Sequence, residues 1–129
     1  MKNKTILVVD DEEETLNLLY KKLEEQGYRV LKAASGTEAV QTAKAETPEL
    51  ILMDIMLPDI DGSEAVRLLR NDPRTEGAKV LFLSGIVSED EGKSIVRLKV
   101  GGIDYPAIPK PFTFQQLIEE IRKILDPSV

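Results

Sequence analysis

Several polar residues stand at the end of apolar runs, and their types suit phosphoryl and metal chemistry. They are Asp10, Asp11, Asp54, Ser84 and Lys110. Carboxylate oxygens are ligands that suit hard cations such as Mg²⁺, and an ionised carboxylate can act as a nucleophile without a general base. An ammonium and a hydroxyl can hold phosphoryl oxygens by charge and by hydrogen bonding. The set therefore indicates transfer of a phosphoryl group to a carboxylate beside a divalent cation.

The stretch from residue 49 to residue 62 is the most informative part of this set. Leu50 to Met53 shows no polar alternation, which is typical of a strand buried on both faces of a parallel sheet. Asp54 follows at the carboxyl end of that strand, the edge where open α/β sheets bind ligands. A lone aspartate more often opens a turn, and a loop with Pro58 and Gly62 follows here. The other polar residues favour the ligand-binding interpretation.

The composition excludes several other kinds of chemistry. The 129 residues are 42% hydrophobic and 31% charged, which suits one globular domain with a core. A net charge of −6 makes the chain a poor candidate for binding nucleic acid. The absence of Cys and His excludes thiolate chemistry, Ser-His-Asp triads and imidazole bases. No apolar run is long enough for a signal core or a membrane span, so we expect a cytoplasmic protein.

The hydrophobic pattern predicts strands and helices in alternation. The predicted strands cover residues 5–9, 28–33, 50–53 and 79–83, and a fifth strand is predicted within 103–109. The predicted helices cover 12–26, 37–44, 63–71, 89–98 and the residues from 113 onward. Pro106 and Pro109 are expected to keep the last strand short, and Gly101-Gly102 to end the fourth helix. Alternating strands and helices predict an α/β domain, a doubly wound (βα)5 parallel sheet of five strands.

The carboxyl ends of parallel strands share one edge of a sheet, so the polar residues are expected to converge. If the first and third strands are neighbours, Asp10, Asp11 and Asp54 meet, flanked by Ser84 and Lys110. Carboxylates about 5 Å apart repel by roughly 3 kcal/mol per pair at an effective dielectric constant near 20. The cluster is therefore expected to raise at least one carboxyl pKa and to be relieved by a divalent cation.

Four segments at predicted strand ends carry a family resemblance. They are Val8-Val9-Asp10-Asp11-Glu12, Asp54-Ile55-Met56-Leu57-Pro58 with Gly62, Leu83-Ser84-Gly85, and Lys110-Pro111-Phe112. Over essentially its whole length the chain resembles a response-regulator receiver domain of two-component signalling. The resemblance implies the flavodoxin-like strand order 2-1-3-4-5. It also implies that residues 1–129 form a single receiver domain with no output domain.

The resemblance implies a role for each site residue. Asp54 accepts a phosphoryl group from a phosphohistidine, while Lys110 and Ser84 hold its oxygens. Mg²⁺ is held by Asp11, Asp54 and the main-chain carbonyl of Met56, with Asp10 acting through water. The bond between Lys110 and Pro111 is expected to be cis. Such a domain is a phosphoacceptor that assists its own phosphotransfer and dephosphorylation, and is not an ordinary enzyme.

The resemblance also implies partners. A histidine kinase or a histidine phosphotransfer protein is the expected donor, which suits a chain that has no histidine of its own. The phosphorylated state is expected to change contacts with an unknown downstream protein. Direct contact with nucleic acid or a membrane is not expected, and the chain is expected to be a monomer or a weak homodimer.

One segment departs from the family pattern. The family's switch couples the Ser84 position to an aromatic residue three positions before the lysine, and here that position is Ala107. The nearest aromatic residue is Tyr105, so either a bulge displaces Tyr105 into that role or the aromatic switch is absent. We predict that residues 86–109 depart most from the family backbone.

Other interpretations remain for the chain and for its residues. An interaction module with this fold and no phosphorylation is the main alternative. A haloacid-dehalogenase-type phosphatase needs an acid where Met56 stands, and flavin binding lacks a phosphate-binding run after the first strand. Taken singly, Asp10 or Asp11 is an N-cap candidate, Ser84 a turn residue and Lys110 a surface lysine.

Overall fold

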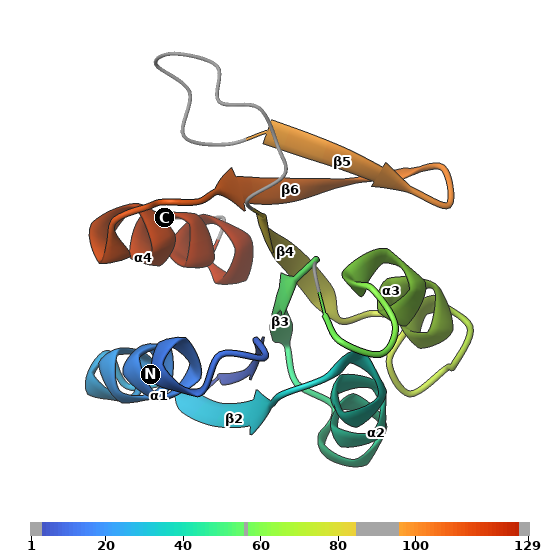
Figure 1. The fold of residues 1–129 in the computed structure, drawn as a ribbon, viewed down its shortest axis with the longest axis horizontal. Helices are drawn as coiled ribbons and strands as arrows, with labels where there is room; N and C mark the ends of the chain where they lie inside the picture. The colour runs from blue at the N-terminus through green and yellow to red at the C-terminus, as the bar shows by residue number, and fades with distance from the viewer. Residues whose placement is uncertain (1–3, 56, 85–95, 127–129) are drawn as a thin grey trace.

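The computed structural model describes residues 4–55, 57–84 and 96–126, which form one sheet with helices on both faces (Figure 1). The strands are β1 (Thr5–Val9), β2 (Arg29–Ala33), β3 (Leu50–Asp54), β4 (Lys79–Ser84), β5 (Val96–Val100) and β6 (Ile103–Pro109). The helices are α1 (Glu13–Glu25), α2 (Gly36–Glu46), α3 (Gly62–Arg70) and α4 (Phe114–Leu125). The strand order is β2-β1-β3-β4-β6-β5, and of these pairs only β5–β6 is antiparallel in the part of the chain described.

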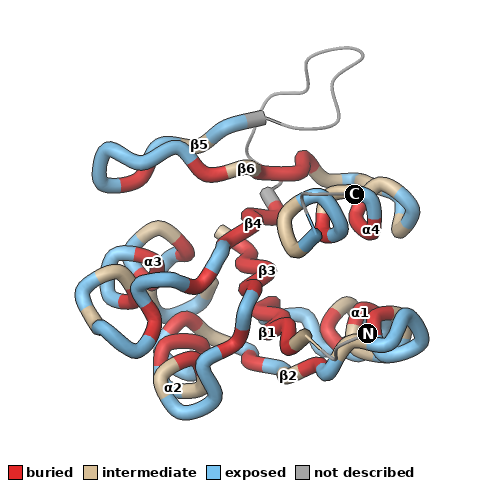
Figure 2. The backbone as a smooth tube through the Cα atoms, turned by 180° about the vertical axis from the view of Figure 1, so that it is seen from behind, coloured by how far each residue is buried: buried red, intermediate tan, exposed pale blue. Residues whose placement is uncertain are grey.

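Two apolar layers cover the sheet, one on each face. Val9, Met53 and Phe82 point into the layer under α2 and α3, whereas Val8 and Leu52 point into the layer under α1 and α4. This split follows from the alternation of side chains along a strand. Every residue of β1 and β3 is buried, while Arg97 and Lys99 of β5 are exposed (Figure 2). The central strands therefore form a rigid frame whose carboxyl ends are held in place.

Helix starts follow the local sequence. The side chains of Ser35, Asp61 and Thr113 each accept a hydrogen bond from the backbone N–H three residues on, so each caps the helix that follows it. Gly27 takes a φ of 98° directly after α1, as expected for a glycine that ends a helix. Within the residues described, no helix has the length and apolar character needed to cross a bilayer.

The predicted fold class is confirmed, with two corrections. The order 2-1-3-4-5 holds when β6 is counted as the fifth strand, but β5 adds a sixth strand at the edge, antiparallel to β6. The predicted helix over residues 89–98 is wrong where it can be tested, because residues 96–98 lie in β5. Its other residues, 89–95, lie outside the described part of the chain.

The missed strand carries a hairpin signal. Residues 96–100 read Val-Arg-Leu-Lys-Val, an alternation of apolar and basic residues with the period of a strand. Gly101 and Gly102 follow with φ values of 60° and 83°, as a two-residue type I′ turn requires. The helix prediction takes residues 89–98 as one helix and the two glycines as its stop. The alternation together with the glycine pair is the better predictor.

The last strand, β6, has seven residues and is longer than its prolines suggested. Pro106 lies opposite Arg97 of β5, and pairing with β4 begins only at the next residue, Ala107. The missing N–H of Pro106 therefore interrupts neither ladder. The β5–β6 register runs without a break, so no bulge displaces Tyr105, and that alternative is wrong.

Candidate functional site

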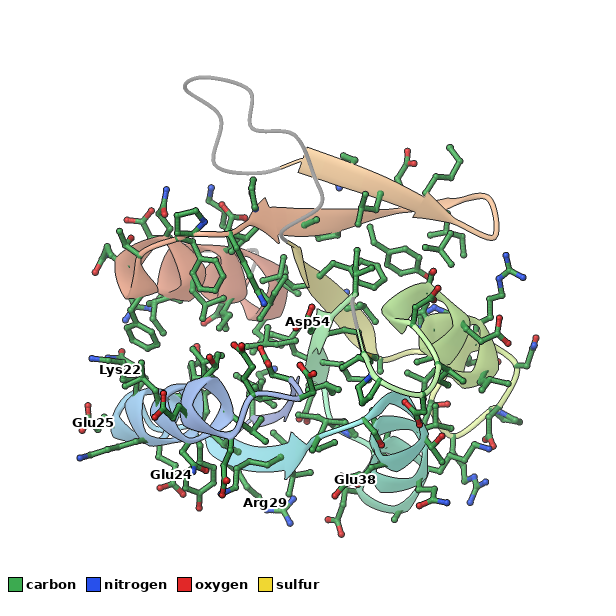
Figure 3. The ribbon with its side chains drawn as sticks, in the orientation of Figure 1. Lys22, Glu24, Glu25, Arg29, Glu38 and Asp54 are labelled. Atoms are coloured by element: carbon green, nitrogen blue, oxygen red, sulfur yellow. The ribbon has the colours of Figure 1, made fainter. Side chains whose placement is uncertain are left out.

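Three carboxylates meet at the carboxyl edge of the sheet. Asp10 follows β1, Asp11 follows Asp10, and Asp54 is the last residue of β3. Each offers one oxygen, and these oxygens all lie within 4.8 Å of one another. The cause is the direct parallel pairing of β1 with β3, in which Val9 lies opposite Met53. Figure 3 shows Asp54 at the end of β3, in the middle of the molecule.

A lysine from the end of β6 joins this cluster. The Nζ atom of Lys110 donates a hydrogen bond to Oδ2 of Asp54 at 3.2 Å and lies 3.7 Å from Oδ2 of Asp10. Asp54 is almost fully buried and Asp10 is completely buried, so solvent screens these pairs poorly. The peptide bond between Lys110 and Pro111 is cis, as expected. The convergence of Asp10, Asp11, Asp54 and Lys110 agrees with the sequence prediction.

Asp10 is the electrostatically strained member of the cluster. Burial raises its pKa above the ordinary value, and the charges of Asp54 and Asp11 raise it further. The N–H of Glu12, which donates to Oδ1 at 2.9 Å, and the charge of Lys110 act in the opposite direction. The expected rise in at least one carboxyl pKa is therefore found.

The donor set fits a hard divalent cation. Within the described residues, Oδ2 of Asp10 is buried and accepts no hydrogen bond, a costly condition for a carboxylate oxygen. Oxygens of Asp11 and Asp54 lie close to it, and Asp11 is exposed. Carboxylates at such spacing match the all-oxygen coordination preferred by Mg²⁺ and Ca²⁺. A bound cation would satisfy the orphaned oxygen and offset the repulsion between the acids.

Two other predicted site residues are placed only in part. Ser84 is the last residue of β4 and pairs with Pro109, so its backbone stands beside the residue that precedes Lys110. Met56, whose carbonyl was expected to bind the cation, lies outside the described residues.

The loop after Asp54 is held by contacts that the sequence analysis missed. Asp59 accepts hydrogen bonds from the backbone N–H groups of Gly36 and Thr37, at 2.9 Å each. Thr37 donates hydrogen bonds to Asp59 from its hydroxyl, which has the larger effect, and from its N–H. These bonds hold the pKa of Asp59 well below its usual range. The site loop is thereby docked on the N-terminus of α2. No sequence signal pairs residues 59 and 36, because only the folded sheet brings them together.

Gly62 closes the same loop against the acceptor strand. Its N–H donates to the carbonyl of Ile55 at 2.9 Å. A Cβ at this position would lie 2.8 Å from the carbonyl oxygen of Asp54 and 3.0 Å from Cα of Ile55. Only glycine allows α3 to begin this close to the end of β3.

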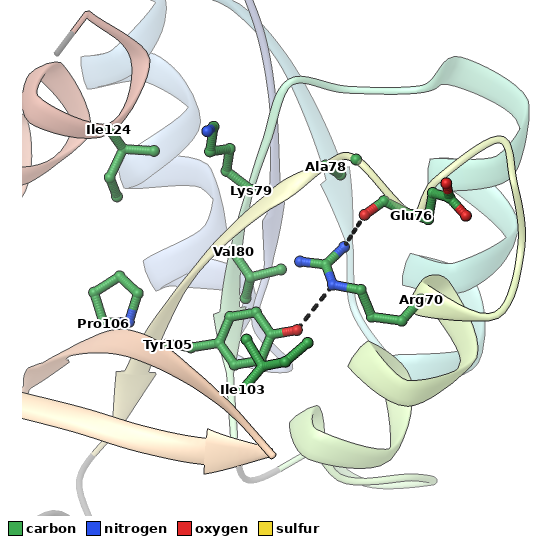
Figure 4. Close-up of a pocket in the computed structure, with 10 residues that line it drawn as sticks. Arg70, Glu76, Ala78, Lys79, Val80, Ile103, Tyr105, Pro106 and Ile124 are labelled. Atoms are coloured by element: carbon green, nitrogen blue, oxygen red, sulfur yellow. Dashed lines mark hydrogen bonds between the residues drawn. The ribbon is translucent and has the colours of Figure 1, made fainter. Parts of the chain in front are cut away.

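Tyr105, the aromatic residue nearest to Ala107 in the sequence, is engaged elsewhere. The hydroxyl of Tyr105 accepts a hydrogen bond from Nε of Arg70 at 2.8 Å, and the ring packs edge-on against Phe82 at 5.8 Å. Arg70 also donates to the carbonyl of Glu76 at 2.9 Å (Figure 4). Tyr105 lines a cavity of about 380 Å³ that Lys79, the first residue of β4, also lines. One side-chain repeat, roughly 7 Å, separates Tyr105 from Ala107 along β6.

Comparison with known proteins gives one consistent family. Residues 6–122 match the family model described as the response regulator receiver domain. The chain is 38% identical over 128 residues to the alkaline phosphatase synthesis transcriptional regulatory protein PhoP of Bacillus subtilis, covering 98% of this chain and 50% of PhoP. It is 30% identical over 122 residues to the polar-differentiation response regulator DivK of Brucella ovis, covering 95% and 96% of the two chains.

A solved structure has the same backbone arrangement. Chemotaxis protein CheY4 of Vibrio cholerae superposes with a TM-score of 0.80 at 26% identity, covering 95% of this chain and 99% of CheY4. The chain spans about half the length of the first two curated relatives and nearly the whole of DivK.

Proposed function

The chain belongs to the response regulator receiver domain family, and from that premise we propose that Asp54 accepts a phosphoryl group from a phosphohistidine on a partner protein. The observation that carries this proposal is the buried Asp54 carboxylate, hydrogen-bonded to Lys110 at 3.2 Å beside two further carboxylates. A carboxylate oxygen held in place by an ammonium is positioned to act as a nucleophile.

The proposed transfer needs no general base in this chain. An oxygen of Asp54 attacks phosphorus, and a new P–O bond forms while the P–N bond to the donor imidazole breaks. The electron pair of that bond stays on the imidazole nitrogen, which takes a proton from solvent. Lys110 holds one phosphoryl oxygen by charge, and Ser84 is the predicted hydrogen-bond donor to another. Water later hydrolyses the acyl phosphate, so the domain is a phosphoacceptor and not an ordinary enzyme.

Mg²⁺ is the proposed cofactor, held by carboxylate oxygens of Asp11 and Asp54 with Asp10 behind them. When bound, it neutralises charge that develops on the transferring phosphoryl group. Lys110 has a separate task, since its hydrogen bond holds the Asp54 carboxylate in one position. Met56 remains the predicted source of a carbonyl ligand.

The proposed donor is a histidine kinase or a histidine phosphotransfer protein. The downstream partner is a protein whose affinity for this domain depends on phosphorylation. We expect the isolated chain to be a monomer or a weak homodimer, without direct contact to nucleic acid or membrane.

Intact mass spectrometry after incubation with acetyl phosphate and Mg²⁺ tests the proposal. We expect one phosphoryl adduct in the wild type, none in Asp54→Asn, and a normal yield in the matched control Asp126→Asn, which removes an exposed carboxylate. Chelation of the metal should abolish the adduct. An adduct that persists in Asp54→Asn contradicts the assignment.

The alternative function, a phosphorylation-independent interaction module, is favoured by one observation. Ala107 stands where an aromatic switch residue was expected, and Tyr105 is hydrogen-bonded to Arg70 in α3. A folded wild-type chain that gains no adduct at saturating acetyl phosphate and Mg²⁺ would favour this alternative.

A further inference from the structure

Among the residues that the structure describes, the outer edge of β5 is an open strand edge. β5 is the last strand of the sheet, and within residues 4–55, 57–84 and 96–126 no other strand pairs with its outer side. An edge strand presents unpaired N–H and C=O groups to which another extended chain can bond. Such edges are sites where extended segments of partner proteins add a strand.

The pairing with β6 identifies which backbone groups face outward. In an antiparallel pair, hydrogen-bonded and non-hydrogen-bonded residue pairs alternate. Arg97 lies opposite Pro106, which has no N–H, so this pair belongs to the non-hydrogen-bonded set. The N–H and C=O groups of Arg97 therefore point to the outer edge, and those of Lys99, two residues on, do the same.

The side chains of β5 give this edge two chemically different faces. Val100 is buried, and Leu98 packs against the apolar layer that lies under α2 and α3. Arg97 and Lys99 are exposed on the opposite face. Lys99 reaches Asp104 of β6 at 3.2 Å, which shows that a carboxylate on a neighbouring strand is within range of this basic pair.

The charge of the edge selects its partner. An antiparallel pairing of two copies centred on Leu98 sets each Arg97 opposite a Lys99, and like charges directly opposite destabilise a strand pair. An acidic strand has the reverse effect, because each of its carboxylates meets a cation. We propose that the outer edge of β5 binds an extended acidic segment of a partner protein by strand addition, with carboxylates facing Arg97 and Lys99 and apolar side chains continuing the layer of Leu98 and Val100.

This inference is independent of phosphorylation at Asp54. The edge uses backbone groups of β5 and two basic side chains, none of which belongs to the carboxylate site. Binding should therefore be measurable in the unphosphorylated chain and in Asp54→Asn.

Fluorescence anisotropy with a short labelled peptide of alternating valine and glutamate tests the proposal. We expect saturable binding to the wild type and binding about tenfold weaker to the double variant Arg97→Gln, Lys99→Gln, which loses two exposed ion pairs. The matched control Lys21→Gln, Lys79→Gln removes the same charge from exposed lysines elsewhere and should bind normally. The peptide with lysine in place of glutamate should not bind.

Two measurements on the wild type separate strand addition from simple charge attraction. The glutamate peptide N-methylated at alternate residues keeps its charge but cannot pair with a strand edge, and it should not bind. Hydrogen exchange should slow at the amides of Arg97 and Lys99 when the unmodified peptide is added. Equal binding of the methylated peptide, no binding of the unmodified one, or a wild-type dimer that the Arg97→Gln, Lys99→Gln variant abolishes would overturn the proposal.

Discussion

The carboxyl edge around Asp54 and the β5–β6 hairpin are built on opposite principles. At the carboxyl edge, fully buried strands force charged groups together, and each group has little freedom to move. In the hairpin, the edge strand β5 precedes a two-glycine turn, and its Arg97 and Lys99 side chains meet solvent. The first region agrees with the arrangement predicted from the sequence, whereas the second departs from the predicted helix.

This difference indicates that the carboxylate cluster and the edge strand β5 depend on separate parts of the sequence. The carboxylate cluster depends on β1, β3 and Lys110, and the strand replacing the expected helix leaves these intact. The edge strand β5 can therefore differ without altering the carboxylate cluster, whereas β6 positions Lys110. The predictions below test whether the two regions are as separate as their construction indicates.

The largest effect is expected at Gly62, in the site. Gly62→Ala places a methyl group 2.8 Å from the carbonyl oxygen of Asp54 and 3.0 Å from Cα of Ile55, and neither backbone atom can move easily. We expect a loss of about 1–3 kcal/mol in the free energy of unfolding, measured by urea denaturation. Phosphorylation by acetyl phosphate should fall as well. Gly77→Ala is the control, because a Cβ there meets nothing within 4 Å, and an equal loss in both variants would contradict the steric argument.

The next effect concerns the charge of the cluster. Burial and the neighbouring acids raise the pKa of Asp10, so folding favours its protonated form. Above pH 3.8, the ordinary pKa of the Asp10 carboxyl, the unfolded chain loses this proton more readily than the native state does. The free energy of unfolding therefore falls as the pH rises through this range. Asp10→Asn removes the cost of burying a charged carboxylate beside two other acids. It should therefore raise the melting temperature of the metal-free protein by a few degrees at neutral pH.

The pH and metal dependence of this variant provide its test. The advantage of Asp10→Asn over the wild type should vanish below pH 3.8, where Asp10 is protonated in both states, and grow as pH rises. Mg²⁺ should raise the melting temperature of the wild type, because it binds the native state, and should raise that of the variant less. A pH-independent difference, or an undiminished response to Mg²⁺, would be inconsistent with strain at Asp10.

The contrast between the two regions explains how far the sequence alone could lead. Asp10, Asp11, Asp54 and Lys110 were predictable because each ends a strand whose direction is dictated by the parallel sheet. The contact of Asp59 with the N-terminus of α2 was not, since it depends on how a loop lies in three dimensions. The hairpin could not be predicted with the same ease because residues 96–100 fit a helical pattern as well as a strand pattern. The glycine pair that follows them is also a common signal for the end of a helix.

A smaller effect is expected from Tyr105→Phe. The change removes the acceptor of the Arg70 hydrogen bond and should cost about 1 kcal/mol in the free energy of unfolding. Tyr105 points toward α3 and not toward Asp54, so the yield and lifetime of the phosphorylated form should not change. A shorter or longer lifetime in this variant would mean that Tyr105 senses the phosphoryl group and that the two regions are coupled. Arg70→Met is the paired control, since it breaks the same bond from the other side.

The smallest effect is expected at the hairpin turn. Gly101 has a φ of 60°, and a Cβ there would meet nothing within 4 Å. Asparagine tolerates this left-handed conformation, and Asn-Gly is a favoured pair in type I′ turns. Gly101→Asn should therefore leave the melting temperature, the phosphoryl adduct and peptide binding at β5 unchanged. Gly62 is favoured by the crowding around it, whereas Gly101 is favoured only by its dihedral angle. A loss of stability in Gly101→Asn comparable to that in Gly62→Ala would show that the hairpin is packed as tightly as the site.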